Sequence, residues 1–484
     1  MLKEVRKIPV TPESHPFITA VNACDFEKNG YIEDEYFLTG TANIYEEDAR
    51  GTLSVRTPDA PYTTRILVRR PADVSRFSCN VVIEVLNATA MYDIDRDWML
   101  TWRKIVRDGD IYIGFTSKGH VVDALKRFDP VRYADINWAN PTPDREAPGA
   151  IGFDFLPAYE LGLVWDMLID LAKVLRTDSP MNPIAEYGKN WLYLAGWSQS
   201  GSYLARIINT FAYLPENCAN GPLFDGYFNT GSGAGNKVLN SYATSTRFFL
   251  GGGAPNGSIL CSKEPLMAVN TESENRGVYW YGDFDEPNCK FRTWQIPCSS
   301  HDTQYTLIDY YAPMMDDMKK ANTVQSWEGF EGEAMNNPYE PIFSAALQAL
   351  FRWVREGIPA PHAPKLETEM TYVPTDKTGA LIANCKDVFG NARGGIRHPF
   401  ADCPTATYQS YTDREDGKIQ MMFGTAKPFS PEKLAALYGN LANYRRLVEK
   451  SADETIAKGF VLAEDREELV ERTVAIAKAR GLTD

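Results

Sequence analysis

The sequence predicts an α/β fold in which helices flank a mostly parallel central sheet. Four short apolar runs are typical of strands that are buried on both faces. These runs are residues 80–86, 111–115, 191–195 and 265–271. Segments with apolar residues at helical spacing follow three of them, at residues 97–106, 154–175 and 202–214. Strands that alternate with helices in this way indicate parallel strands joined by crossover helices.

The segments outside this alternation predict an antiparallel edge, a lid and a C-terminal cap. Residues 31–68 alternate between apolar and polar side chains, as antiparallel strands do. Two helix-like segments on either side of an acidic, glycine-rich stretch predict a lid-like insertion near residues 302–340. We therefore expect a core domain at residues 1–358. A cap region with a loop-and-strand segment and a terminal helical extension is expected at residues 359–484.

Composition and charge restrict the class of protein. A chain of 484 residues with 44% hydrophobic content can bury a large core. The net charge of −14 argues against a nucleic-acid groove or an anionic membrane surface, because both favour basic patches. No apolar segment is long enough to span a bilayer, and the N-terminus MLKEVRKIPVTPES lacks the apolar centre of a secretory signal. We expect a cytoplasmic protein with a small-molecule partner, whose eight scattered cysteines are free thiols.

Motifs for metals and cofactors are absent from the sequence. The five histidines lie far apart, and neither His-x-x-x-His nor Cys-x-x-Cys occurs. No Gly-x-Gly-x-x-Gly follows a predicted strand. We therefore expect neither a metal nor a cofactor. Nothing in the sequence specifies an oligomeric state.

The most informative segment is NWLYLAGWSQSG at residues 190–201, where a buried strand ends in a Gly-x-Ser-x-Ser-Gly turn before a helix. A sharp strand-to-helix turn exposes a serine hydroxyl and leaves the next backbone N–H free for an oxyanion. Ser198 occupies this position, and Gly196, Ser200 and Gly201 supply small side chains at the bend. The turn predicts Ser198 as a nucleophile. The alternative is an ordinary turn in which Ser198 caps the helix.

A serine nucleophile of this kind needs a carboxylate and a histidine base, which follow it along the chain in that order. His301 lies on a short loop after a strand-like segment, as expected for a histidine that follows the last strand. The strand at residues 265–271 ends beside Glu272 and Glu274, at the sheet edge where catalytic groups collect. We expect Glu274 to be the acid, because the loop has cleared the sheet three residues past the strand. Glu272 is the alternative acid.

Two other histidines are candidates for the pocket. His398, in GNARGGIRHPF, competes as the base, since the paired glycines and Pro399 indicate a constrained loop. The chain order favours His301, in which case His398 lines the pocket. His120 follows the strand at residues 111–115 and precedes Ser198, so we expect it to line the site.

The second oxyanion donor is expected in the loop after the strand at residues 80–86. A small residue such as Ala88 lets a backbone N–H approach the substrate oxygen closely. We therefore pair the N–H groups of Gln199 and Ala88, with Asn87 as a substitute through its backbone or its side-chain amide. Asn87 and Trp197 are also candidates for substrate contact.

Several segments resemble the α/β-hydrolase superfamily, and more narrowly the bacterial family called alpha/beta hydrolase domain, whose elbow tends to read Gly-x-Ser-Gln-Ser. The resemblance covers most of the chain. It includes HPFITA, GYIEDEYFLTGTANIY, VVIEVLNATAMYDIDRDW, GWSQSG, FRTWQIPCSSHDTQYTL, GNARGGIRHPFADCPTATY and GFVLAEDREELVERT. It implies an α/β-hydrolase fold with Ser198 as nucleophile, an acid within TESE, and His301 as base. The chain departs from the family at Pro297-Cys298, where Ala-Gly is usual, and in carrying a Glu instead of the commoner Asp.

The expected activity is cleavage of a carboxylic ester of a small to medium apolar or aromatic substrate, through an acyl-enzyme intermediate. An acyltransferase or a lactonase with the same triad is the nearer alternative. A non-catalytic binding module on the same fold is the more distant one, because a fold alone does not establish a function.

Overall fold

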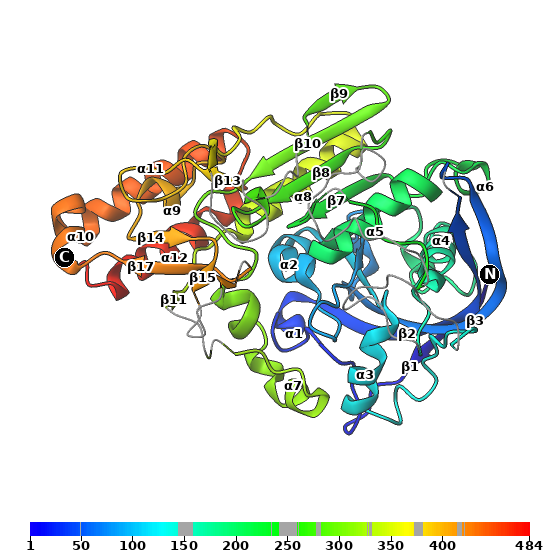
Figure 1. Cartoon of the computed structure of the whole chain (residues 1–484). Helices are drawn as coiled ribbons and strands as arrows, with labels where there is room; N and C mark the ends of the chain where they lie inside the picture. Colours follow the sequence, from blue (N-terminus) through cyan, green and yellow to red (C-terminus); the bar gives the residue numbers. More distant parts are fainter. Residues whose placement is uncertain are drawn as a thin grey trace. The chain divides into compact units, whose positions relative to one another are not determined.

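The computed structural model describes residues 1–48, 50–143, 158–233, 235–241, 259, 261–276, 282–326, 328, 332–371, 381–413, 419–420 and 422–484. These residues form two compact units. Figure 1 shows the described chain, coloured from the N-terminus to the C-terminus. The first unit comprises Met1–Glu264 and Tyr311–Val324, and the second comprises Pro265–Tyr310 and Gln325–Asp484. This division differs from the core and cap expected from the sequence, which stay a prediction.

The described residues of the first unit form seven strands in the order β1-β2-β3-β5-β4-β6-β7. They are β1 (Leu2–Ile8), β2 (Tyr31–Glu47), β3 (Leu53–Pro71), β4 (Asn80–Val85), β5 (Ile111–Phe115), β6 (Trp191–Trp197) and β7 (Gly226–Thr230). Strands β1 to β3 form an antiparallel edge, and β3 runs antiparallel to β5. The pairs β4–β5, β4–β6 and β6–β7 are parallel. The expected mostly parallel sheet with an antiparallel edge is therefore confirmed.

The parallel strands are mostly apolar because they are covered on both faces. Every residue of β4, β5 and β7 is buried. In the register of β4 and β6, Ile83 lies opposite Leu194. The carboxyl ends of β4, β5 and β6 consequently meet at the same edge of the sheet, which is where loops carry functional groups.

The helices of the first unit include the predicted ones. They are α1 (Phe26–Asn29), α2 (Arg96–Asp108), α3 (Val122–Phe128), α4 (Val164–Val174), α5 (Gly201–Arg206), α6 (Pro215–Cys218) and α7 (Met315–Ala321). Helix α2 ends at Gly109, whose φ of 80° suits a glycine at a helix C-terminus. A π-helical turn, Ile207–Phe211, continues α5. Part of the segment expected to be helical at residues 154–175 lies outside the described residues.

The second unit holds the strands β8 (Leu266–Asn270) and β10 (Cys289–Gln295), which are parallel, and β9 (Phe284–Glu286), which pairs antiparallel with β10. Smaller sheets and the remaining helices complete it. These elements are β11 (Glu333–Ala334), β12 (Thr368–Thr371), β13 (Leu381–Asn384), β14 (Ala406–Gln409), β15 (Thr412–Asp413), β16 (Ile419–Gln420), β17 (Thr425–Pro428), α8 (Glu340–Glu356), α9 (Pro399–Asp402), α10 (Pro431–Tyr438), α11 (Leu441–Ala457) and α12 (Arg466–Ala479).

A small core of the second unit fixes the loop that follows β10. Cys298 of this loop packs into a cluster with Phe400 of α9 and with Tyr408 of β14. Helices α10, α11 and α12 lie at the C-terminal end of the chain. Asn440 caps α11 through its side chain, which accepts a hydrogen bond from the Asn443 N–H, so the helical run divides there.

The cysteines depart from expectation. Cys261 and Cys289 are disulfide-bonded, so the expectation that all eight are free thiols is wrong for these two. Disulfides are typical of oxidising compartments, and the cytoplasmic location stays a prediction. Among the described residues, no helix combines the length and the apolar character that crossing a membrane requires.

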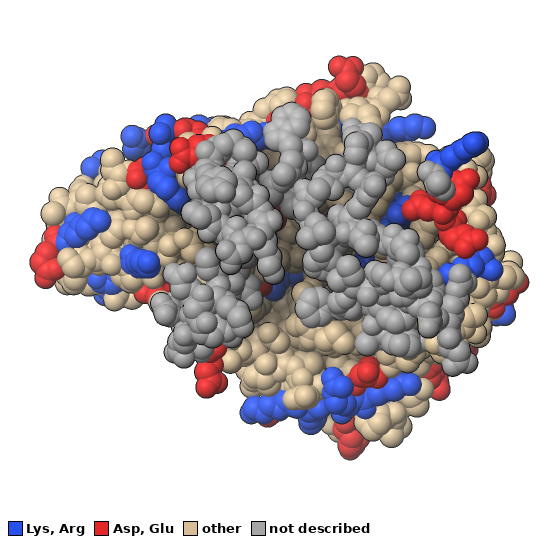
Figure 2. Space-filling model, viewed as in Figure 1, with Lys and Arg blue, Asp and Glu red and all other residues tan. Residues whose placement is uncertain are grey.

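Charged side chains of both signs lie next to one another on the face seen in Figure 2. Exposed ion pairs such as Lys319–Asp316 (3.1 Å) and Arg445–Glu471 (2.6 Å) are examples of such mixing. Exposed pairs contribute only about 0–1 kcal/mol each. The ion pairs that matter for the candidate site are instead buried.

Candidate active site

The turn after β6 has the backbone that a nucleophile elbow requires. Ser198 has a φ of 56°, in the left-handed region that is uncommon for any residue except glycine. Its side chain is partly exposed, whereas Ser200 is buried. A Cβ at Gly201 would lie 2.2 Å from Asn229 Oδ1, and one at Gly196 would lie 2.7 Å from Leu204 Cδ1. The two glycines therefore allow β6 and α5 to meet at this tight bend.

A buried lysine that was not identified from the sequence joins the elbow to two strand ends. Lys118 is fully buried just after β5. Its Nζ donates to the Leu86 carbonyl oxygen (2.6 Å), to Ser117 Oγ (2.7 Å) and to Ser200 Oγ (3.0 Å). This contact explains why a serine stands where the common motif has its second glycine. Nothing in the sequence marks a single lysine for such a role.

The loop after β4 is closed on itself. We call residues 87–95, where the second oxyanion donor is expected, the oxyanion loop. Asn87 and Ile94 exchange two backbone hydrogen bonds (3.0 and 2.8 Å) at its base. The Asn87 side chain accepts from the Thr89 N–H (2.8 Å) and donates to the Trp197 carbonyl oxygen (3.1 Å). Asn87 therefore ties the oxyanion loop to the elbow, which favours Ala88 over Asn87 as the oxyanion donor.

The other two candidates of the first unit are His120, which contacts the oxyanion loop, and Trp197, which ends β6. His120 is buried, and its Nε2 lies 3.1 Å from the Ala88 carbonyl oxygen. Trp197 is also buried, and the Arg96 guanidinium lies 5.5 Å from its ring centre. Both side chains are therefore placed to hold Ala88 and the end of β6.

The second unit brings the expected acid and base together. Glu274 Oε1 lies 2.7 Å from His301 Nδ1, and both side chains are only 7% exposed. Glu274 Oε2 accepts hydrogen bonds from the N–H (2.6 Å) and the hydroxyl (2.7 Å) of Thr271. The His301 N–H donates to Ser273 Oγ (3.0 Å). A carboxylate at Nδ1 favours the tautomer with its proton there, which leaves Nε2 as the basic nitrogen.

The alternative acid, Glu272, has a different set of partners. It is fully buried, and its Oε2 accepts a hydrogen bond from the Cys298 N–H (2.7 Å). Its Oε1 accepts from Asn384 Nδ2 (3.1 Å) and from Lys386 Nζ (3.4 Å). Cys298 has a φ of 55°, at the place where glycine is usual in the family that the chain resembles. Glu272 thus holds the loop before His301 in a conformation that is costly for a cysteine.

These partners predict different effects for the two glutamates. Glu274→Gln is expected to lower kcat by about three to four orders of magnitude, because an amide does not select the His301 tautomer. Glu272→Gln is expected to leave kcat within a few-fold and to lower the free energy of unfolding by about 1–3 kcal/mol. Steady-state kinetics and denaturant unfolding of both variants measure this. A larger loss of kcat in Glu272→Gln would assign the acid to Glu272.

His398 also contacts the loop that precedes His301. It is buried, and its Nε2 lies 3.1 Å from the Pro297 carbonyl oxygen, to which only a protonated Nε2 can donate. Burial lowers the pKa of His398 to about 4, so the imidazole is neutral at pH 7. This position makes His398 a support of the loop that carries His301.

The low pKa of His398 makes stability depend on pH. Below pH 6.5 the unfolded chain binds the proton first, so stability present above pH 6.5 is lost as the pH falls towards 4. The expected loss is up to about 1.4 kcal/mol per pH unit in this window. Unfolding in urea at pH 7 and pH 5 measures it. His398→Gln, which keeps a donor for the Pro297 carbonyl, should flatten the difference, and an equally steep dependence in this variant would contradict the assignment.

Ser198 belongs to the first unit, and the Glu274–His301 pair belongs to the second. The supporting contacts of Thr271, Ser273 and Lys118 were not identified from the sequence. Thr271 and Ser273 lie within the segment TESE, in which the acid was expected, so their place in the sequence pointed to this site. Their hydrogen bonds become visible only in three dimensions.

Comparisons with known proteins found similar solved structures at low sequence identity. Solved structures that resemble this one include esterase Est22 (14% identity, TM-score 0.33, covering 62% of this chain and 82% of that chain). Another is the carboxylesterase Cest-2923 from Lactobacillus plantarum WCFS1 (12% identity, TM-score 0.26, covering 47% and 71%). Similarity at this level bears on neither substrate nor mechanism. No curated protein matches the chain.

A family model gives the broader match. The model described as alpha/beta hydrolase domain matches residues 4–471, which is nearly the whole chain. The match includes the elbow, the oxyanion loop and the Glu274–His301 pair. The chain therefore belongs to the alpha/beta hydrolase domain family.

Proposed function

We propose that this protein is a serine hydrolase that cleaves carboxylic esters of small to medium apolar or aromatic compounds. The observation that carries the proposal is the left-handed backbone of Ser198 at the end of a buried parallel strand. Such a conformation is uncommon outside glycine, and it is the feature that presents a nucleophile at a strand-to-helix turn. The hydrogen bond between Glu274 and His301 supports it, since it supplies the acid and the base.

The proposed reaction has two halves. Ser198 Oγ attacks the ester carbonyl carbon while His301 Nε2 takes the hydroxyl proton and then gives it to the departing alcohol. Water next attacks the acyl-enzyme, loses a proton to His301, and releases the acid and free Ser198. Glu274 holds the imidazole and stabilises its charge. The N–H groups of Ala88 and Gln199 are assigned to the oxyanion, with each donor contributing about 3–4 kcal/mol to the lowering of the barrier.

Labelling by a fluorophosphonate tests this proposal directly. Wild-type protein is expected to gain one adduct by intact mass, and peptide mapping should place it on Ser198, because only an activated serine displaces the fluoride. Ser200→Ala is the matched control: it removes a buried hydroxyl two residues away and should still be labelled. An unlabelled wild type would favour the binding module, and an adduct on Ser200 would move the nucleophile.

Product analysis then separates the nearer alternatives. An ester library incubated in buffer is expected to yield the free acid. An acyltransferase would need an added alcohol or amine, and a lactonase would open rings faster than it cleaves linear esters. Either result would leave the proposed triad unchanged but would reassign the acyl acceptor or the substrate class.

A further inference from the structure

Two buried arginines of β3 each bridge a glutamate of β2 and an aspartate of the oxyanion loop. Arg65 lies between Glu35 and Asp93, and Arg69 lies between Glu33 and Asp95. All six side chains are at most 1% exposed. Arg65 and Arg69 are four residues apart on one strand, and Glu33 and Glu35 are two apart on its neighbour, so each pair projects from the same face. The same Glu–Arg–Asp arrangement thus occurs twice.

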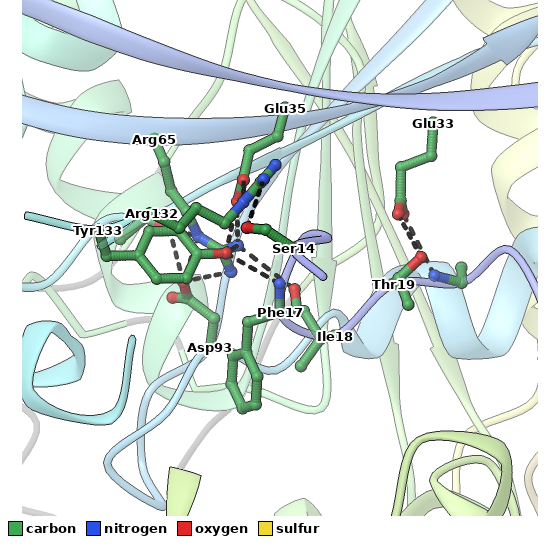
Figure 3. Close-up of polar contacts among 12 residues, drawn as sticks. Ser14, Phe17, Ile18, Thr19, Glu33, Glu35, Arg65, Asp93, Arg132 and Tyr133 are labelled. Carbon is green, nitrogen blue, oxygen red and sulfur yellow. Dashed lines mark hydrogen bonds and ion pairs between the residues drawn. The ribbon is translucent and has the colours of Figure 1, made fainter. Parts of the chain in front are cut away.

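Figure 3 shows the bridge through Arg65 with its partners Glu35 and Asp93. Its Nη1 donates to Glu35 Oε1 (2.5 Å), and its Nη2 donates to Asp93 Oδ2 (3.0 Å). Asp93 Oδ2 also accepts from Thr116 Oγ1 (2.5 Å) at the end of β5. Arg132 Nε donates to Glu35 Oε2 (2.6 Å), so the two carboxylates are matched by two guanidinium groups.

The bridge through Arg69 is built in the same way. Arg69 Nε donates to Glu33 Oε2 (2.7 Å), and its Nη1 donates to Asp95 Oδ2 (2.5 Å). Arg69 Nη2 donates to the carbonyl oxygen of Ile18 (3.0 Å). Ile18 has a φ of 57°, which is strained for a β-branched residue. The bridge therefore also fixes the N-terminal segment, in which Thr19 Oγ1 donates to Glu33 (2.6 Å; Figure 3).

The two aspartates lie on either side of Ile94, whose backbone closes the base of the oxyanion loop on Asn87. Ala88 follows Asn87 directly. Fixing Asp93 and Asp95 therefore fixes the base from which the Ala88 N–H projects. Resting on the function proposed above, we infer that Arg65 and Arg69 are positioning residues that hold the oxyanion loop, and with it the Ala88 donor, in the place that ester cleavage needs.

The energetics of buried ion pairs agree with a positioning role. Burying charged groups costs desolvation energy, which the attraction between them at best offsets. Well-packed apolar residues in their place often give equal or greater stability. What a guanidinium adds is direction, because its N–H donors form a rigid fork that donates hydrogen bonds to carboxylates at fixed angles. An oxyanion donor displaced by about 1 Å costs on the order of a hundredfold in rate.

The test compares aspartates inside and outside the two bridges. Asp93→Ala and Asp95→Ala are expected to lower kcat for a chromogenic ester about tenfold to hundredfold with KM little changed. Asp95→Ala leaves Arg69 paired with Glu33, so it keeps a charge-balanced pair. Asp34→Ala is the matched control: Asp34 also pairs from β2 to a buried arginine of β3, Arg70 (2.7 Å), but not through the oxyanion loop. Its kcat should stay within a few-fold of wild type.

A reversible trifluoromethyl ketone separates positioning from partial unfolding. Ser198 Oγ adds to the ketone carbon, its proton passes to His301, and the carbonyl electrons become an oxyanion that samples the same donors. The inhibition constant is a property of the folded, active protein, so partial unfolding of a variant does not change it. For Asp93→Ala and Asp95→Ala it is expected to weaken by the same factor as kcat falls. Asp93→Asn, which keeps the acceptor oxygen, should recover most of both.

Two results would overturn the inference. One is an unchanged inhibition constant in both loop variants, which would leave the bridges a purely structural role. The other is an equal loss in Asp34→Ala. Failure of the proposed function is recognised separately, since it would appear as full activity in Ser198→Ala whatever the aspartate variants do.

Discussion

Ser198→Ala is expected to lower kcat for ester hydrolysis by about five to six orders of magnitude while the chain stays folded. The change removes only the attacking oxygen, and in serine hydrolases the members of a triad act as a unit, so the loss of the nucleophile removes nearly all of its contribution. The residual rate then comes from binding and the oxyanion donors. A chromogenic ester assay at saturating substrate, with circular dichroism as the folding check, measures both.

Ser198→Gly supplies the control for this experiment. Glycine adopts a positive φ without the steric cost of about 1–2 kcal/mol that a Cβ brings. Ser198 has a φ of 56°, so the glycine variant should unfold at an equal or higher denaturant concentration and should be equally inactive. Substantial turnover in either variant would remove Ser198 from the mechanism.

His301→Ala is the second large effect that we expect, with a loss in kcat of about five to six orders of magnitude, as for the nucleophile. Without Nε2, nothing takes the Ser198 proton or returns it to the leaving alcohol. His398→Ala should instead lower stability and reduce kcat modestly, because its Nε2 is already committed to the Pro297 carbonyl oxygen. Kinetics over pH 5–9 on both variants provide the comparison.

The two histidine variants also give opposite expectations under the competing assignment. If His398 were the base, His398→Ala would be the inactive variant and His301→Ala the impaired one. A fluorophosphonate reports on the same point without a substrate, since labelling of Ser198 should slow far more in His301→Ala than in His398→Ala. Equal slowing would leave neither histidine as the base.

Local signals in the sequence predicted the parts of the structure that depend on neighbouring residues. The elbow was predictable because a buried strand, small residues and a helix all lie within residues 190–214. The parallel strands were predictable because strands covered on both faces need apolar side chains throughout. The sequence favoured Glu274 over Glu272 only by its place in the loop, and the different partners of the two side chains become visible only in the fold.

Charged residues inside strands carried a signal that was missed. Arg65 and Arg69 interrupt the apolar segment TTRILVRRP, and Glu33 and Glu35 interrupt the strand that pairs with it. Such residues are almost never fully buried unless they are paired. Their spacing placed them on common faces, but the aspartates that complete the bridges come from a loop whose path only the folded chain defines.

The segment Thr271–Glu274 has a consequence for how the sequence can vary. Thr271 and Glu274 bind each other, Glu272 binds the Cys298 N–H and Ser273 binds the His301 N–H, so consecutive side chains reach separate targets. Inserting or deleting one residue here would move the side chains on one side of the change away from their partners. Loops of hydrolases usually tolerate changes of length, but this one is expected to keep its length in all active relatives of the chain, even where its individual residues differ.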